Sequence, residues 1–187
     1  MRNYTLLWII CILLMSAYPL AGGSWQWATS FGGQGMESAW DMDVNTLSGD
    51  IYVCGDFTDS LVVAGSVYPA SGESDSYIIK YNSLGMFQWI WTCGSTEQDV
   101  CLSIATDAAG NCCFSGFYSG TLVIGNNQYQ SNGGWEGYLG KLSADGELLW
   151  FRSFGGPLTD LGYGISVDQE GNCYVTGWFG GTIDFGN

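Results

Sequence analysis

Three stretches of the chain decide its fold: SAWDMDVNTLSGDIYVCGDF at residues 38–57, CLSIATDAAGNCCFSGFY at 101–118 and GYGISVDQEGNCYVTGWF at 162–179. Each holds two short apolar runs joined by a polar link that contains a glycine. Gly49, Gly110 and Gly171 recur every 61 residues, and Trp89 and Trp150 keep the same spacing. One extra residue falls in the first unit, before Gly49. So many matches in one register identify an internal repeat.

Each unit is composed of short strands separated by turns. Residues 103–106 and 112–117 are apolar and β-prone, and the link at 107–111 suits a type I turn followed by a left-handed glycine. A second hairpin is predicted to join 138–142 to 148–152, and shorter strands are predicted at 61–64, 121–124 and 182–185. No segment after residue 23 has the 3.6-residue period of a helix.

The period favours one architecture among the repeat folds. It is longer than one rung of a β-helix and suits a four-stranded propeller blade with a long connection. Strands such as WIW at 89–91 are apolar on both faces, which fits sheets buried between copies of themselves. We therefore predict an all-β fold of β-propeller blades, in which Trp27, Trp89 and Trp150 pack between blades.

The number of units predicts how the blades are completed. Residues 24–187 hold about 2.7 units, placed approximately at 27–88, 89–149 and 150–187, with the last one truncated. A propeller needs about four to eight blades to close. We therefore expect an incomplete propeller or a fragment of a larger one, completed by further blades of a longer chain or by self-association.

The repeat also resembles a known family. Its motif is carried by FGG at 154–156, by DQEGNCYVTGWF at 168–179 and by KLSADGELLW at 141–150. This combination is similar to the SBBP repeats of secreted bacterial proteins, which are named for a seven-bladed β-propeller. The resemblance covers essentially all of residues 25–187. It implies a secreted or surface propeller and carries over no catalytic residues. The first unit departs from the motif at Asn45, where the others have aspartate, and the second departs at Cys93, where the others have phenylalanine.

Residues 1–23 are typical of a secretory signal peptide. Arg2 supplies a positive start, residues 6–17 are an apolar run, and AGG at 21–23 suits cleavage. The run is shorter than the ~20 residues of a membrane-spanning helix. We expect a secreted, periplasmic or cell-surface protein with no membrane insertion after cleavage, and an uncleaved anchor is the alternative.

Charge and composition exclude several classes of function. The chain has 4 Lys and Arg, 18 Asp and Glu and no His, for a net charge of −14. Nucleic-acid binding requires cations that neutralise phosphate, so we expect no nucleic-acid partner. Chemistry that needs imidazole is excluded. We predict no enzyme activity but a binding or scaffold module for an extracellular glycan or protein. The alternatives are a structural spacer of a larger surface protein and a glycoside-acting enzyme with paired carboxylates.

The candidate ligand-binding residues are Trp135 and Glu136, in the glycine-rich link SNGGWEG at 131–137. The corresponding link of the first unit has no tryptophan, so Trp135 does not belong to the repeating core. An aromatic side chain on a polar loop can stack on a sugar or anchor a peptide. Local packing is the alternative role.

Carboxylates that recur between units are the candidate metal ligands. A propeller would place each set in a ring around its axis, where several oxygens could hold Ca²⁺. Aspartate at the start of a turn also caps backbone N–H groups, which is the role we favour. We therefore predict no cofactor, with Ca²⁺ as the alternative; the candidate ligands are Asp99, Asp107, Asp160 and Asp168.

Six cysteines follow residue 23. The repeat places Cys112 and Cys173 in the slot of Ile51, and Cys113 in the slot of Tyr52. These are positions for buried apolar side chains, and a free cysteine packs as a small hydrophobe. We therefore expect buried thiols. One or two disulfides and a metal site are the alternatives.

Overall fold

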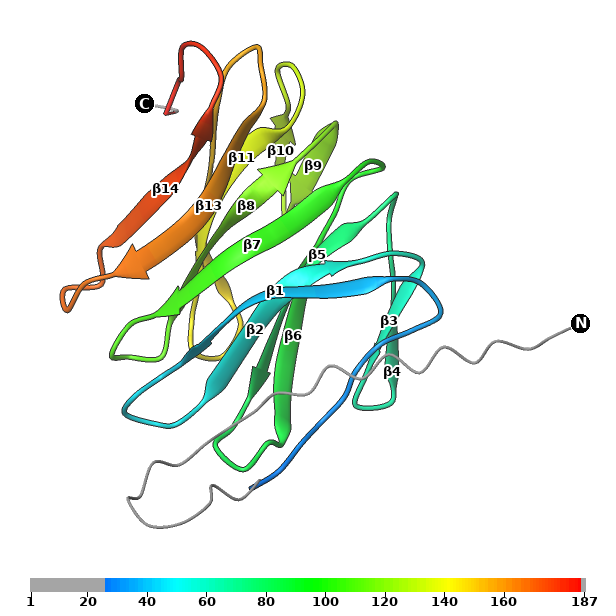
Figure 1. Ribbon diagram of the computed structural model, residues 1–187, viewed down its shortest axis with the longest axis vertical. Helices are drawn as coiled ribbons and strands as arrows, with labels where there is room; N and C mark the ends of the chain where they lie inside the picture. The colour runs from blue at the N-terminus through cyan, green and yellow to red at the C-terminus, as the bar shows by residue number, and fades with distance from the viewer. Residues whose placement is uncertain (1–25, 186–187) are drawn as a thin grey trace, which may run out of the picture.

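The chain is all-β from residue 26 to residue 185, the part that the computed structural model describes. Fourteen strands follow one another in this range without a helix (Figure 1). The predicted signal peptide and its cleavage site lie outside the described residues. Among the residues that are described, no helix is long and apolar enough to cross a membrane.

The strands form two four-stranded antiparallel sheets and the start of a third. The first sheet has the order β1 (Glu37–Val44), β2 (Ile51–Phe57), β5 (Asp75–Tyr81), β6 (Phe87–Cys93). The second has the equivalent order β7 (Asp99–Thr106), β8 (Cys112–Tyr118), β11 (Glu136–Leu142), β12 (Leu148–Phe154). The third consists of β13 (Asp160–Val167) and β14 (Cys173–Phe179).

A short hairpin is inserted between the second and third strands of each complete sheet. These hairpins pair β3 (Ser60–Val63) with β4 (Ser66–Pro69), and β9 (Thr121–Ile124) with β10 (Asn127–Gln130). The predicted strands at 61–64 and 121–124 are therefore confirmed as β3 and β9. The strand predicted at 182–185 is wrong, because only Asp184 bridges to Gly155. No second hairpin strand is present for it among the described residues.

The prediction of propeller blades is confirmed by the arrangement of these sheets. The innermost strands β1, β7 and β13 lie side by side and run in the same direction, and the sheets fan out from them without closing a ring (Figure 1). Hydrogen bonds join neighbouring inner strands directly. Asp41 of β1 accepts from the Ser103 hydroxyl of β7 at 2.7 Å, and that hydroxyl accepts from the Ile165 backbone N–H of β13 at 3.3 Å.

The tight turns have the predicted chemistry. Gly110 and Gly171 have φ of 81° and 82°, a left-handed conformation that glycine adopts without strain. Each N–H donates to the carbonyl of the aspartate three residues earlier, Asp107 or Asp168. In the first blade, Gly49 donates instead to Asn45, four residues earlier. The extra residue of the first unit is therefore accommodated in this turn.

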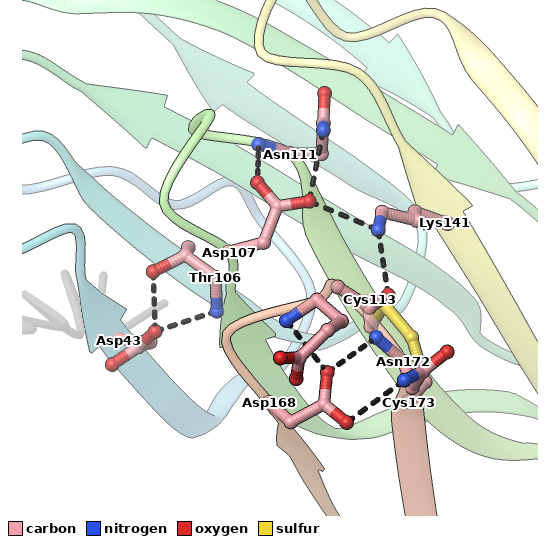
Figure 2. Close-up of a disulfide and its surroundings, with 11 residues drawn as sticks. Asp43, Thr106, Asp107, Asn111, Cys113, Lys141, Asp168, Asn172 and Cys173 are labelled. Atoms are coloured by element: carbon pink, nitrogen blue, oxygen red, sulfur yellow. Dashed lines mark hydrogen bonds and ion pairs between the residues drawn. A yellow bond between two sulfur atoms is a disulfide. The ribbon is translucent and has the colours of Figure 1, made fainter.

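Trp89 and the recurrent lysines join adjacent blades. Trp89 of β6 donates to the Ala144 carbonyl in the second blade at 2.9 Å, which confirms its predicted place between blades. Lys80 donates to the same carbonyl at 2.9 Å and pairs with Asp50 at 3.0 Å. One blade further on, Lys141 pairs with Asp107 and donates to the Gly171 carbonyl (Figure 2).

The cysteines correct part of the sequence prediction. Cys54, Cys93, Cys101 and Cys112 are buried thiols, as expected. Cys113 of β8 and Cys173 of β14 instead form a disulfide between the second and third sheets, with their Cα atoms 6.5 Å apart (Figure 2). Comparison of the repeats shows which positions are equivalent, but it does not show which positions of adjacent blades lie opposite each other. Here the position equivalent to Tyr52 in the second blade, Cys113, lies next to the position equivalent to Ile51 in the third blade, Cys173.

Thiol labelling checks this assignment. We expect the folded protein to leave its cysteines unlabelled, because the four free thiols are buried. Unfolding without a reductant should expose four thiols from residues 26–185, and reduction should expose Cys113 and Cys173 in addition. Six thiols in the unfolded, unreduced protein would contradict the disulfide.

Candidate functional site

A recurrent irregularity in the innermost strands shapes one end of the blade array. In β1, β7 and β13 the pairing with the next strand skips one residue, which is Trp40, Leu102 or Tyr163. Each skipped residue is a β-bulge, and a bulge turns its side chain out of the regular alternation of the strand. The three side chains occupy equivalent positions of three blades and line one cavity.

A glycine in the second strand of each blade makes room for the bulge. Gly55, Gly116 and Gly177 pair with the residue that directly precedes the skipped one. A Cβ atom on Gly116 would lie 1.9 Å from the backbone oxygen of Val100, far inside van der Waals contact. A glycine within a strand is a sign of a bulge or of close backbone approach. Its recurrence is the signal from which the bulged residues could have been predicted.

The cavity at this end, which we name the Trp135 groove, has a volume of about 470 Å³. Buried apolar side chains form its base, and exposed aromatic rings and a few polar groups complete the lining. Inner strands of all three blades contribute to it. The lining residues are Ser38, Trp40, Asp56, Gln98, Val100, Leu102, Phe117, Trp135, Leu161 and Tyr163.

Trp135 is held in this groove by a ring contact. Its indole stacks on Phe117 of β8 with centroids 4.3 Å apart and an angle of 24° between the rings. The side chain is still 38% exposed, so packing against Phe117 leaves part of it open to solvent. Trp135 also lines a neighbouring polar cavity of about 500 Å³ that contains Glu73 and Glu97. The sequence-predicted residue therefore stands between two cavities.

Asp56 is the carboxylate of the Trp135 groove. It accepts a hydrogen bond of 2.7 Å from the indole Nε1–H of Trp40, which orients that ring. Burial raises the pKa of the Asp56 carboxyl above its ordinary value, although hydrogen bonds from Trp40 and Ser38 oppose the rise. The two ion pairs of the described chain involve other carboxylates, Asp50 and Asp107. Asp56 thus has no cationic partner among the described residues.

Glu136 does not join Trp135 in the groove. Trp135 precedes β11, whereas Glu136 is its first residue and is buried, with only 3% of its surface exposed. Its carboxylate accepts from the backbone N–H of Asn132 at 3.1 Å. Burial, together with the negative charge of Asp160, raises its pKa. Glu136 therefore stabilises the loop that carries Trp135, and the structure separates the two sequence-predicted ligand residues.

Two carboxylate pairs lie where adjacent blades meet: Asp75 with Asp99, and Glu136 with Asp160. Asp99 is fully buried and accepts from the backbone N–H and the hydroxyl of Ser95 at 2.6 and 2.8 Å. Burial raises the pKa of Asp99 to about 7, and the charge of Asp75 adds to the rise. One oxygen of Asp75 and one of Asp99 are buried without a hydrogen-bond partner.

The other two candidate metal ligands lie at the opposite end of the inner strands. Asp107 and Asp168 line a cavity of about 550 Å³ together with Asp43 (Figure 2). Both cap their turns, because Asp107 accepts from the N–H groups of Ala109 and Asn111, and Asp168 has the equivalent bonds. The predicted turn-capping role is thus confirmed for both.

The remaining candidates cap loops as well. Asp160 accepts from the N–H groups of Gly156 and Gly180 at 2.8 and 2.9 Å, as Asp99 does from Ser95. Within residues 26–185 there is no group of three or more His, Cys, Asp and Glu side chains that could hold a metal ion. The absence of a cofactor, with Ca²⁺ as the alternative, stays a prediction, which a metal titration of the folded protein would test.

Comparisons with known proteins agree with the fold. Residues 149–178, which run from β12 into β14, match the model of the SBBP β-propeller repeat. An uncharacterized WD repeat-containing protein of Acanthamoeba polyphaga mimivirus is 27% identical over 135 residues, which cover 63% of this chain and 10% of that protein. This chain thus matches about a tenth of the relative's length, and WD repeats also build propeller blades. Residues 149–178 thus match the SBBP β-propeller repeat, and the two complete sheets and the beginning of a third have the arrangement of propeller blades.

Proposed function

We propose that this chain is a secreted, non-catalytic β-propeller module that binds an extracellular glycan or protein in the Trp135 groove. One observation carries the proposal. Trp40, Trp135 and Tyr163, which come from three different blades or their loops, remain 38–59% exposed and line the same cavity. Exposed aromatic rings that converge on a concave site are typical of ligand binding.

The lining of the groove suits recognition without chemistry. Indole and phenol rings offer flat apolar faces for a sugar ring or a peptide side chain, and their polar atoms can still form hydrogen bonds. Ser38, Asp56 and Gln98 add polar groups that could orient a ligand. A few polar groups on a mostly apolar lining are the usual composition of a binding pocket.

The carboxylates support a non-catalytic role. Glycoside hydrolysis requires two carboxyl groups on either side of the scissile bond, but Asp56 is the single acid among the groove-lining residues. The paired acids at the blade junctions are buried, with at most 3% exposure for Asp75, Asp99, Glu136 and Asp160. Each of them accepts a hydrogen bond from its own loop, and none of them lines the groove.

Two features support export of the protein. Residues 1–23 have the three parts of a signal peptide. The Cys113–Cys173 disulfide is the kind of bond that persists in oxidising compartments outside the cytosol. Mass spectrometry of the protein from culture fluid and cell envelope would test this part of the proposal, since an exported protein should begin near Ser24.

Binding is tested with a tryptophan variant and a matched control. Trp135→Ala should weaken binding to glycan arrays and to surface-protein extracts at least about tenfold, because it removes one wall of the groove. Trp178→Ala is the control, since Trp178 is 64% exposed on β14 and does not line the groove. A structural spacer would bind nothing that Trp135→Ala weakens, and that result would contradict the proposal.

A further inference from the structure

We propose that the Trp135 groove selects a lysine-type ammonium side chain on a partner protein. The inference rests on the proposed function and narrows its ligand to one chemical class. Three features of the groove carry it: the exposed aromatic faces, a carboxylate without a cationic partner, and an apolar base that matches an alkyl chain.

The aromatic faces favour a cation. Trp40 and Tyr163 are 56% and 59% exposed, and Trp135 is 38% exposed on the same cavity. The face of an aromatic ring carries partial negative charge, so it attracts an ammonium group that lies within about 6 Å of its centre. Tryptophan is the strongest of the aromatic residues in this interaction, and the groove contains two of them.

The charges at and near the groove favour the same class. Asp56 uses one oxygen to accept from Trp40 and has no ion pair within residues 26–185. No lysine or arginine lines the groove. Across Trp135, the neighbouring cavity adds Glu73 and Glu97 and also lacks a cation. An incoming ammonium would therefore meet a negative potential from both sides of Trp135.

The base of the groove distinguishes a lysine side chain from a bare cation. Val100 and Leu161 are only 4% and 3% exposed and line the cavity beside Leu102. A lysine can lay its four methylene groups on such a surface and keep its charged end at a polar group. Asp56 is that polar group in the groove. A neutral sugar could stack on the rings and donate hydroxyl groups to Asp56, but it would leave the charge of the carboxylate without an opposite charge.

The probe is a library of short displayed peptides, selected on the wild-type protein after removal of binders to Trp135→Ala. We expect the selected peptides to share a lysine. Replacing that lysine with norleucine, which keeps the alkyl chain and removes the charge, should weaken binding at least about tenfold. Asp56→Asn should weaken binding to a similar extent, because the amide has no negative charge to attract the ammonium group. The amide oxygen can still accept the hydrogen bond from Trp40, so the orientation of that ring is kept. Trp178→Ala should bind as the wild type does.

Each outcome bears on a different claim. Selected peptides without lysine, or peptides that bind equally well after the change to norleucine, overturn the inference. Failure of the selection, combined with glycan binding that depends on Trp135, overturns the lysine inference and keeps the proposed function. If neither peptides nor glycans bind in a Trp135-dependent way, both claims fail. Circular dichroism and thermal unfolding would show whether Asp56→Asn is folded. If that variant loses both its fold and its binding, the comparison of the lysine peptide with its norleucine form decides whether the groove selects an ammonium group.

Discussion

Asp99→Asn is expected to raise the free energy of unfolding at about pH 8, by up to about 4 kcal/mol. Asp99 is fully buried where the first two blades meet, close enough to Asp75 for the second carboxylate to raise its pKa further. Asparagine has nearly the same shape, can still accept from Ser95, and removes a charge that the folded protein must keep away from water. The substitution therefore removes an electrostatic cost.

The same pKa gives the direction of the pH dependence. The folded state holds the Asp99 proton up to a pKa of about 7, whereas the ordinary value is 3.8. A raised folded-state pKa contributes stability that is full below about pH 4 and is lost as the pH rises through about 7. We therefore expect the wild-type protein to lose stability between these values and Asp99→Asn to lose much less.

Asp107 acts in a separate pH range. Burial alone would raise its pKa, but hydrogen bonds from Asn111 and the ion pair with Lys141 lower it. A lowered folded-state pKa contributes stability above the ordinary value and loses it as the pH falls through the lowered one. Its effect therefore appears below about pH 4, outside the range of Asp99.

Denaturant unfolding over a series of pH values separates these contributions. The control is Asp145→Asn, the same chemical change on an exposed turn residue outside the acid pair. Wild-type stability that rises between about pH 4 and pH 8, or a profile that Asp99→Asn does not alter, would contradict the account of the acid pair.

Phe114→Ala is expected to lower the free energy of unfolding by about 3 to 5 kcal/mol. Phe114 of β8 is fully buried between the first two blades. Its ring centroid lies 5.0 Å from that of Trp91 in the first blade and 6.0 Å from that of Tyr138 in its own blade. Removing the ring leaves a cavity in the core that joins the blades. Thermal or denaturant unfolding measures the loss.

The residue opposite Phe114 provides a sharper form of this test. Phe114 pairs with Gly140 across β8 and β11, and a Cβ atom on Gly140 would lie 2.3 Å from the ring. The first blade has Val53 opposite Ile79 at the equivalent pair. Gly140→Ile alone should therefore be strongly destabilising. The double variant Phe114→Val with Gly140→Ile should recover a coupling energy of about 2 to 3 kcal/mol. Additive losses would show that the side chains at positions 114 and 140 do not share this packing.

Most of the fold could be predicted from the sequence, because the signals are local and repeated three times. The turn at 107–111 and its copy at 168–172 follow from aspartate and glycine chemistry, and the hairpin of β11 and β12 follows from its apolar runs. The order of strands in each sheet then follows from sequential antiparallel pairing.

The sequence was less informative about the site, because the site depends on contacts between blades. Trp135 can be identified from the sequence because it breaks the repeat. Glu136 does not share its place, because Glu136 begins β11 as a buried side chain, whereas Trp135 precedes the strand and stays partly exposed. Trp40 and Tyr163 are turned toward the groove by β-bulges. The sequence signal of these bulges is a recurrent glycine in the neighbouring strand, which does not by itself point to the two aromatic residues. The Cys113–Cys173 disulfide also depends on how one blade lies against the next.

The most direct test of the central claim, that the Trp135 groove binds ligand, is a nuclear magnetic resonance titration that follows the indole N–H signals. The titrant is a peptide or glycan that the wild-type protein selects. We predict that the signals of Trp40 and Trp135 shift together and saturate at the same ligand concentration, while the signal of Trp178 on β14 stays in place. Shifts at Trp178 with unchanged Trp40 and Trp135 signals would place the ligand elsewhere and contradict the account.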